Sequence, residues 1–424
     1  MPQFRFIHTA DIHLDSPVRG LTGYEGPVAE RIRTATRQAL ENLVGEAIEQ
    51  AVDFLVIAGD LYDGDWRDYQ TGLFFVRQMG RLANARIPVY LLHGNHDAES
   101  QITKRLTLPP GVFTFSSRKP ETFQIKELGV ALHGQSFQHR DVKENLARFY
   151  PDPVKGSFNI GVLHTGLGGL GGHENYAPCS MDDLVNKGYD YWALGHVHQQ
   201  AILHERPHVV FCGNLQGRHV RESGSKGAFL VAVAEDIVTG LTALHTDVVR
   251  WRILRIPLEG CDCYPDAVGR IRREIEGAIA KESDGCLLAL RIELTGRTPI
   301  HDRLLVSTED LLAEARAAAL SLGDETAWIE RVLVSTEAAL DAQAVAAWED
   351  AVGDLQRMLD DAAGDPDLLQ KLESDIGELV RKLPPDVRGE PEDVALATAV
   401  HADYPDLITQ VRGYLHARLV SRED

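Results

Sequence analysis

Short apolar runs alternate with longer helical patterns in the first part of the chain. Residues 54–58 and 88–92 are apolar and rich in strand-forming side chains, as buried strands are, and residues 4–8 (F-R-F-I-H) also read as a strand. Between them, residues 28–50 and 69–83 repeat their apolar side chains at the spacing of an amphipathic helix. This alternation predicts a mainly parallel sheet that helices cover on both faces.

The chain between residues 111 and 234 is richer in short strand patterns. We expect a helix at residues 141–149. Further strands are expected at residues 158–163, 189–194, 209–213 and 228–234. The first 250 residues are therefore interpreted as two α/β halves that meet at one edge.

The pattern changes near residue 250. Strand patterns at 251–257, 287–294 and 327–334 alternate there with helical patterns at 266–281 and 308–320. Beyond residue 335 helical patterns dominate, at 343–363, 366–383 and 405–420, with a linker expected at 384–393. We predict an α/β protein in three parts: residues 1–250, a small α/β domain at 251–336, and an acidic helical region at 337–424.

Polar side chains of a few kinds follow five of the predicted strands in the first part. In chain order they are Asp11 and His13; Asp60 and Asp63; Asn95, His96 and Asp97; His164; and His196 and His198. In a parallel sheet, ligands bind where the carboxyl ends of the strands meet. We therefore expect these side chains to lie close together.

Carboxylates, imidazoles and one amide form a ligand set for two divalent ions such as Mn²⁺, Fe²⁺ or Zn²⁺. The absence of thiolates disfavours a structural zinc site. His196 and His198 alternate along an extended segment, so their side chains point the same way. Any one cluster alone has a plain structural explanation, such as a turn or a hydrogen-bonded histidine. Five in this order favour a two-metal site that clamps a phosphate ester.

The five clusters resemble the signature of the calcineurin-like metallophosphoesterases. Two segments, D-I-H-L-D-S-P at 11–17 and C-G-N-L-Q-G-R-H at 212–219, resemble in particular the SbcD/YhaO-type DNA repair exonucleases. The resemblance covers residues 1–250. It implies a two-sheet metallophosphoesterase sandwich flanked by helices, then a small α/β capping domain that binds DNA, and a helical C-terminal region.

The resemblance also implies a role for each cluster. Two metal ions, Mn²⁺ above all, would be held by Asp11, His13 and His198 on one side, by Asn95, His164 and His196 on the other, and by Asp60 between them. His96 would contact the scissile phosphate or protonate the leaving 3′ oxygen, and Asp97 would orient the His96 ring. Asp63 stands where the eukaryotic and archaeal relatives carry histidine, so no catalytic role is assigned to it.

Residues beyond these clusters have less specific interpretations. Arg218, His219 and Lys226 are candidate phosphate contacts, although a solvated loop explains them equally well. The glycines between residues 166 and 172 match a dinucleotide-binding pattern but open no clear helix, so we interpret them as a substrate-side loop.

The function that these features imply is a manganese-dependent DNA nuclease of DNA repair, acting as an exonuclease and also as an endonuclease. The resemblance implies DNA, a second copy of the chain and a coiled-coil ATPase of the SbcC or YhaN kind as partners, the last docking on the helical tail. The alternatives are a phosphatase or nucleotide phosphodiesterase on the same fold, and a catalytically inert scaffold. Gly64-Asp65 and Asp97 differ from the residues of protein phosphatases, and no metal ligand is missing, as it would be in a scaffold.

Composition changes this picture little. The net charge of −20 argues against binding nucleic acid through a globally basic surface. However, residues 337–424 carry 20 acidic and 8 basic side chains, a net charge of −12, so most of the excess lies in the tail. With no long apolar run, no signal-peptide pattern and five scattered cysteines, we expect a reduced cytoplasmic protein that does not enter a membrane.

Overall fold

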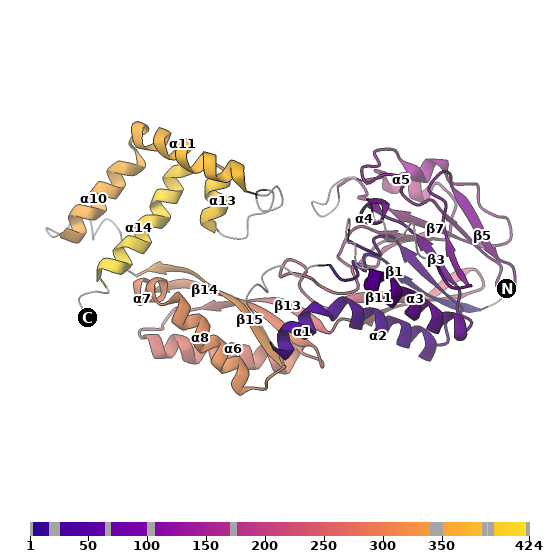
Figure 1. Ribbon diagram of the computed structural model, residues 1–424, viewed down its shortest axis with the longest axis horizontal. Helices are drawn as coiled ribbons and strands as arrows, with labels where there is room; N and C mark the ends of the chain where they lie inside the picture. Colours follow the sequence, from indigo (N-terminus) through magenta and orange to yellow (C-terminus); the bar gives the residue numbers. More distant parts are fainter. Residues whose placement is uncertain are drawn as a thin grey trace. The chain divides into compact units, whose positions relative to one another are not determined.

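The computed structural model describes residues 3–16, 26–63, 69–99, 107–169, 176–339, 351–383, 388 and 394–420. The chain divides into two compact units (Figure 1). The first unit comprises residues 1–252, 281–289 and 324–328, and the second comprises 253–280, 290–323 and 329–424. Two short segments that the sequence placed in the second part of the chain therefore return to the first unit.

Two six-stranded sheets build the first unit, in the strand orders β12-β11-β1-β2-β3-β4 and β5-β6-β7-β8-β10-β9. The first sheet contains β1 (Phe4–Thr9), β2 (Phe54–Ala58), β3 (Val89–Leu92), β4 (Val112–Thr114), β11 (Gly227–Ala234) and β12 (Ile237–His245). The second sheet contains β5 (Glu121–Ile125), β6 (Val130–Gly134), β7 (Phe158–His164), β8 (Tyr191–Gly195), β9 (Ala201–Glu205) and β10 (His208–Phe211). The four strands β1 to β4 run parallel, and so do β6, β7, β8 and β10.

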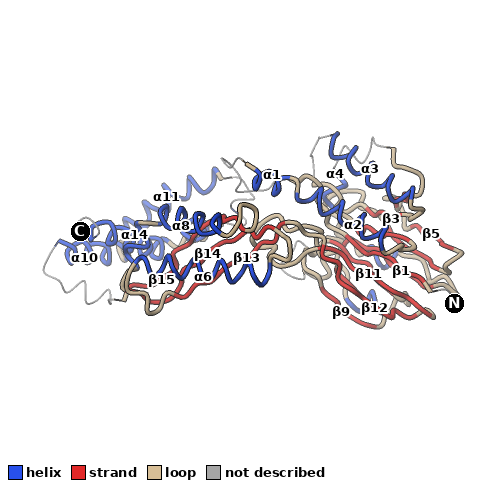
Figure 2. Tube along the Cα trace, turned by 90° about the horizontal axis from the view of Figure 1, so that it is seen from below, coloured by secondary structure: helices blue, strands red, loops and turns tan. Residues whose placement is uncertain are grey.

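Helices cover the outer face of each sheet (Figures 1 and 2). The described helices of the first unit are α1 (Pro27–Arg33), α2 (Ala35–Glu49), α3 (Tyr69–Asn84), α4 (Asn95–Glu99), the 3₁₀ helix η1 (Leu146–Phe149) and α5 (Met181–Val185). Among the described residues, no helix has both the length and the apolar character needed to cross a bilayer.

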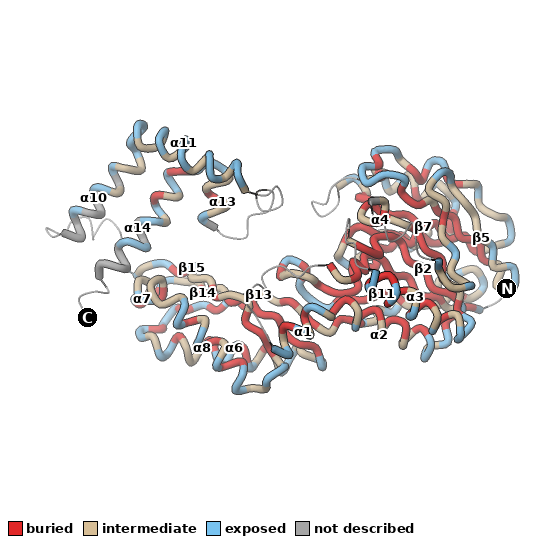
Figure 3. Tube along the Cα trace, viewed as in Figure 1, coloured by how far each residue is buried: buried red, intermediate tan, exposed pale blue. Residues whose placement is uncertain are grey.

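Alternation along the strands explains the layering. Phe6 and Phe54 stack with their ring centroids 4.9 Å apart and point between the two sheets, where they meet Tyr191. Their neighbours Ile7 and Leu55 point the other way and pack under α2 and α3. Both faces of these strands are buried (Figure 3), and β2 accordingly appears in the sequence as a continuous apolar run. The predicted α/β sandwich flanked by helices is confirmed.

The third sheet has three strands in the order β13-β14-β15. Its strands are β13 (Val249–Pro257), β14 (Leu287–Thr298) and β15 (Ala327–Ala338). The helices of the second unit are α6 (Tyr264–Glu282), α7 (His301–Val306), α8 (Thr308–Ser321), α10 (Ala351–Ala363), α11 (Pro366–Lys382), α13 (Val394–Val400) and α14 (Tyr404–Val420). In the tail, α14 packs against α7 and α10, which agrees with the predicted helical C-terminal region.

Some local predictions were wrong. The helix expected at 141–149 is reduced to η1, because the Val142 carbonyl accepts a hydrogen bond from Ala177 N at 2.7 Å. The single helix expected at 28–50 is divided into α1 and α2 at Thr34, whose hydroxyl donates to the Glu30 carbonyl. Residues 343–350, most of the linker at 384–393, and residues 170–172 of the glycine-rich loop lie outside the described residues.

Candidate metal centre

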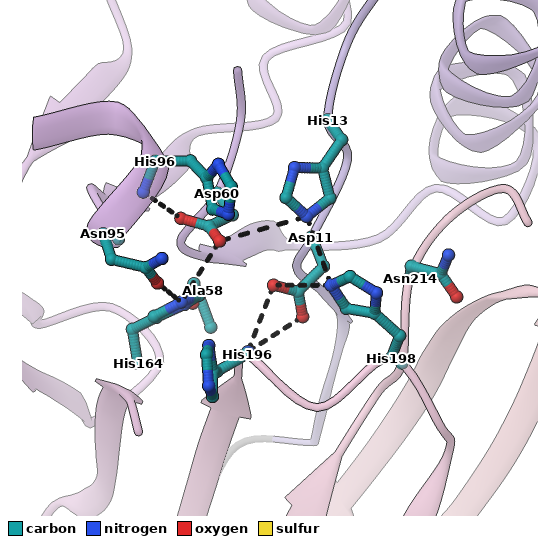
Figure 4. Close-up of polar contacts among 12 residues, drawn as sticks. Asp11, His13, Ala58, Asp60, Asn95, His96, His164, His196, His198 and Asn214 are labelled. Atoms are coloured by element: carbon teal, nitrogen blue, oxygen red, sulfur yellow. Dashed lines mark hydrogen bonds and ion pairs between the residues drawn. The ribbon is translucent and has the colours of Figure 1, made fainter. Parts of the chain in front are cut away.

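The predicted ligands gather at the carboxyl ends of the parallel strands of both sheets (Figure 4). Asp11 and His13 follow β1, Asp60 follows β2, and Asn95 begins α4 directly after β3. His164 ends β7, and His196 and His198 follow β8. The structure thus brings all seven side chains together from two sheets.

Within the described part of the chain, three groups of side chains have ligand atoms that lie within 4.8 Å of one another. They are Asp11–His13–His198, His13–Asp60–His96 and Asp60–His164–His196. Asp60 Oδ2 lies 3.4 Å from His164 Nε2 and 3.9 Å from His13 Nε2, so this carboxylate faces both sides of the cluster. Asn95 joins through its Oδ1, 2.9 Å from His164 Nε2.

The backbone at the strand ends is strained in a way that aims these side chains. Asp11, His13, Asp60 and His196 have φ angles of 49°, 44°, 50° and 100°, a region that residues other than glycine seldom adopt. Hydrogen bonds from Asp11 N to Gly59 O (2.9 Å) and from His13 N to Asp60 O (3.0 Å) join the two loops. Strain of this kind persists where the surrounding structure enforces it, and it concentrates at functional sites.

Glycines allow the loops to approach the ligands closely. A Cβ atom on Gly94 would collide with Asp60 Oδ1, and one on Gly59, whose φ is 104°, would collide with His164 Nδ1. A side chain at either position would therefore displace a ligand. The sequence signal for this is the glycine that precedes Asp60 and the one that precedes Asn95.

The donor set fits two divalent cations. His13 Nε2 and His198 Nε2 lie 3.2 Å apart, next to two buried carboxylates. Burial raises the pKa of Asp11 to about 6. Burial opposes the charge on His164, but the Asp60 carboxylate outweighs it and raises the pKa of His164 to about 9. Such a concentration of carboxylates and imidazoles needs protons or cations between its members, and transition ions bind these donor types.

Hydrogen bonds fix the orientation of the His164 ring. Its Nδ1 lies 3.0 Å from the carbonyl oxygen of Ala58, which can only accept. The proton of the neutral ring therefore sits on Nδ1, and Nε2 faces Asp60 and Asn95 with its lone pair.

Beside the ligands, His96 pairs with Asp63. Its Nδ1 lies 2.8 Å from Asp63 Oδ1, and the His96 side chain is 29% exposed. Burial opposes the charge on both groups. Their mutual hydrogen bond outweighs it, raising the pKa of His96 and lowering that of Asp63. Asp63 also accepts a hydrogen bond from the Ser16 hydroxyl at 2.5 Å.

The contacts of Asp97 suggest a different role from the predicted one, in which Asp97 orients the His96 ring. The Asp97 carboxylate accepts hydrogen bonds from the backbone amides of Leu61 (3.1 Å), Tyr62 (2.9 Å) and Gly94 (3.0 Å). It thereby ties the loop after β2 to the loop after β3. Asn95, His96 and Asp97 form the first turn of α4, and consecutive helical side chains point in different directions.

The predicted phosphate contacts also interact with protein groups. Arg218 lies 3.2 Å from Glu222 Oε1 and 3.6 Å from Asp63 Oδ2. Lys226 Nζ donates to the His198 carbonyl at 2.8 Å, and His219 Nε2 lies 3.6 Å from Glu222. Sequence reasoning missed Glu222, whose only signal was its position four residues after Arg218.

Comparison with known proteins identifies the domain that carries this site. The family model described as calcineurin-like phosphoesterase matches residues 4–200. The chain contains a calcineurin-like phosphoesterase domain. The resemblance seen in the sequence is thereby confirmed, and all seven predicted ligands lie within the phosphoesterase domain. A second model, the middle domain of metallophosphoesterase YhaO, matches residues 251–337.

Curated relatives share the phosphoesterase domain. An uncharacterized metallophosphoesterase YhaO of Bacillus subtilis is 40% identical over 232 residues, which are 54% of this chain and 57% of that protein. A DNA double-strand break repair protein Mre11 of Sulfurisphaera tokodaii is 25% identical over 264 residues, 58% of this chain and 64% of that one. The chain thus spans less than two thirds of the length of either relative.

Solved structures match the chain at low sequence identity. A dimetal phosphatase from Danio rerio is 12% identical, with a TM-score of 0.36 over 58% of this chain and 98% of that one. Because this score is low, the fold assignment rests on the two sheets and on the family model.

Proposed function

We propose that this protein is a DNA nuclease that depends on two divalent metal ions, most simply Mn²⁺, and hydrolyses phosphodiester bonds in DNA repair as an exonuclease and an endonuclease. The observation that supports this most is the convergence of seven oxygen and nitrogen donors beside the His96–Asp63 pair. The Sulfurisphaera tokodaii relative, which is named as a DNA double-strand break repair protein, supports the choice of DNA as the substrate.

The site residues divide into metal ligands and groups that transfer protons. Asp11, His13 and His198 would hold one ion, Asn95, His164 and His196 the other, and Asp60 would be shared. When bound, the two ions supply Lewis acidity to a phosphate ester and its attacking water.

The chain's own groups complete the site. His96 is partly exposed, so a phosphate can reach its ring, and Asp63 orients that ring and raises the pKa of His96. His96 can therefore donate a proton to the leaving oxygen.

A phosphatase or nucleotide phosphodiesterase on the same fold is the second candidate. One observation favours it: Asp63, rather than the histidine of the archaeal and eukaryotic nucleases, is the partner of His96. An inert scaffold is disfavoured because every predicted ligand position retains a ligand-type side chain.

The partners follow from the same proposal. Residues 251–337, which match the YhaO middle domain, are the proposed capping domain for DNA. A second copy of the chain, and a coiled-coil ATPase of the SbcC or YhaN kind on the helical tail, complete the proposed assembly. A cytoplasmic location agrees with the five free cysteines.

The test compares wild type with His96→Ala on linear duplex DNA and on a small phosphodiester, with Mn²⁺ and with EDTA. We expect Mn²⁺-dependent degradation of DNA that EDTA abolishes and that His96→Ala slows by roughly 10²–10⁴-fold. The matched control is His139→Ala, which removes an exposed histidine. Hydrolysis of the small ester without hydrolysis of DNA would favour the second candidate, and full activity of His96→Ala would remove the role given to His96.

A further inference from the structure

The His198 ring is held from the side that faces away from the ligand cluster. Its Nδ1 lies 2.6 Å from Glu222 Oε1, while its Nε2 lies 3.2 Å from His13 Nε2 and 4.0 Å from Asp11 Oδ1. A carboxylate can only accept a hydrogen bond, so the proton of the neutral ring sits on Nδ1. The lone pair on Nε2 then points at the atoms with which His198 would share a metal ion (Figure 4).

Glu222 is itself fixed by several donors. Its Oε2 accepts hydrogen bonds from Arg218 N at 2.7 Å and from Asn214 Nδ2 at 3.0 Å. The Arg218 guanidinium lies 3.2 Å from Oε1, and the Glu222 side chain is only 6% exposed. The carboxylate therefore has little freedom to release the ring.

Two ligand histidines are thus oriented by different means. His164 is fixed by the backbone carbonyl of Ala58, which a substitution does not remove. His198 is fixed by a side chain, which a substitution does remove. Carboxylates behind metal-binding histidines typically contribute about 10- to 100-fold to metal affinity or activity.

We propose that Glu222, clamped by Arg218, is a positioning residue that fixes the His198 imidazole for binding the metal ion shared with Asp11 and His13. This inference rests on the proposed two-metal function. Arg218 then acts within the protein rather than on the phosphate. Because it also reaches Asp63, it connects the support of His198 with that of His96.

Nitrogen NMR of the wild-type protein without metal tests the geometry directly. With ¹⁵N-labelled histidine, the His198 signals are assigned by their loss in His198→Asn. We expect the neutral ring to carry its proton on Nδ1. A proton on Nε2 would overturn the inference without any Glu222 variant.

Calorimetric titration of the metal-free protein with Mn²⁺ tests the consequence. Wild type should bind two ions per chain. In Glu222→Ala, the affinity for one of the two ions should be lower by roughly 10- to 100-fold. Glu222→Gln keeps an acceptor oxygen, so its affinity for that ion should fall less.

The matched control is Glu330→Gln, since Glu330 belongs to the second unit. There its Oε1 forms a partly buried ion pair with Arg291 Nη2 at 2.5 Å. Thermal unfolding without metal shows whether each variant folds. If Glu222→Ala does not fold, Glu222→Gln and the wild-type NMR decide.

Two failures are distinguishable. If wild type binds two ions and Glu222→Ala titrates like Glu330→Gln, the inference on Glu222 is wrong and the proposed function stands. If wild type binds no Mn²⁺, the proposed function is wrong and the inference is wrong with it.

Discussion

At the scale of single residues, two aspartates near the candidate metal centre have different hydrogen-bond partners. Asp63 pairs with the His96 ring, whereas the Asp97 carboxylate accepts hydrogen bonds from three backbone amides of two loops. In the proposed function the first contact serves proton transfer at the site, whereas the second joins the two loops that form the site. Substitutions at the two positions should therefore have different consequences.

We expect Asp63→Asn to lower kcat by roughly 10²-fold or more, because a positioned proton donor contributes about 10²–10⁴-fold. Its unfolding free energy should fall less than that of Asp97→Ala, because asparagine keeps an acceptor oxygen for the Ser16 hydroxyl. Asp97→Ala leaves three buried amides without their acceptor, at about 1–3 kcal/mol each, so it should mainly destabilise the protein. Urea unfolding and kinetics on the same samples check this. If Asp97→Ala were stable but had a low kcat while Asp63→Asn stayed active, Asp97 would be the residue that orients the His96 ring.

A second prediction concerns Gly94. Replacing it with alanine places a Cβ against Asp60 Oδ1, so Gly94→Ala should weaken Mn²⁺ binding at least tenfold. Gly80→Ala in α3 is the control, because a Cβ there meets nothing within 4 Å. Titration with Mn²⁺ gives the result, and equal affinity of the two variants would contradict the close packing described here.

Much of the site was predictable at this scale, since strands β1, β2, β3, β7 and β8 all end in or are followed by ligand-type side chains. The pairing of particular carboxylates with particular imidazoles was not predictable. Asp63 and His96 are separated by 32 intervening residues, and Glu222 and His198 by 23. Such pairs form only when loops from different strands fold together, and neighbouring residues in a helical turn diverge.

At the scale of elements, β1 and β8 are joined across the sandwich by His8. Its Nδ1 lies 3.0 Å from the Tyr191 hydroxyl, and its Nε2 lies 3.2 Å from the Leu194 carbonyl. The ring is fully buried, and burial lowers the pKa of His8 from 6.5 to about 3. The neutral ring is therefore part of the packing between the two sheets.

This predicts a pH dependence of stability. Because the folded-state pKa lies below the unfolded one, the unfolded chain binds the proton first as the pH falls below 6.5. As the pH falls from 6 to 4, the unfolding free energy of the metal-free wild type should therefore decrease more steeply than that of His8→Gln. The difference should be about 1.4 kcal/mol per pH unit. Urea unfolding at several pH values measures the slope. Equal slopes for wild type and His8→Gln would contradict it, and His139→Gln, at an exposed position, serves as the control.

Elements with two buried faces were predictable, because burial leaves a continuous apolar run, as in β2 (Phe54–Ala58). The edge strand β12 was missed, since its side chains are partly exposed and its sequence is mixed. The helix expected at 141–149 was wrong because a contact with Ala177, distant in the sequence, takes one of its carbonyls.

At the scale of the whole molecule, the first unit includes two segments that return from beyond residue 252. Trp251 meets Trp328 edge to face, with the ring centroids 5.9 Å apart. Arg31 donates to the carbonyls of Val248 and Gly285 at 3.3 and 3.0 Å. The sequence pattern does not show that these segments belong to the first unit, because each segment continues the pattern of the residues next to it in the chain.

A fragment ending at residue 250 should therefore unfold at a lower temperature than one ending at residue 339. The shorter fragment lacks Trp251 and both returning segments, so it exposes apolar surface that the longer one buries. Thermal unfolding of both fragments without metal makes the comparison. Equal transition temperatures would mean that the returning segments contribute nothing to the first unit.

The central claim is that two metal ions lie among seven ligands while His96 stays outside as a proton donor. The alternative is that His96 binds a metal ion, because His13, Asp60 and His96 also form a group of possible ligands. Anomalous diffraction at the manganese edge from Mn²⁺-loaded crystals distinguishes the two. We predict two peaks, one at Asp11, His13 and His198 and one at Asn95, His164 and His196, with Asp60 at both and His96 still paired with Asp63. A single peak, or a peak coordinated by His96, would contradict the claim.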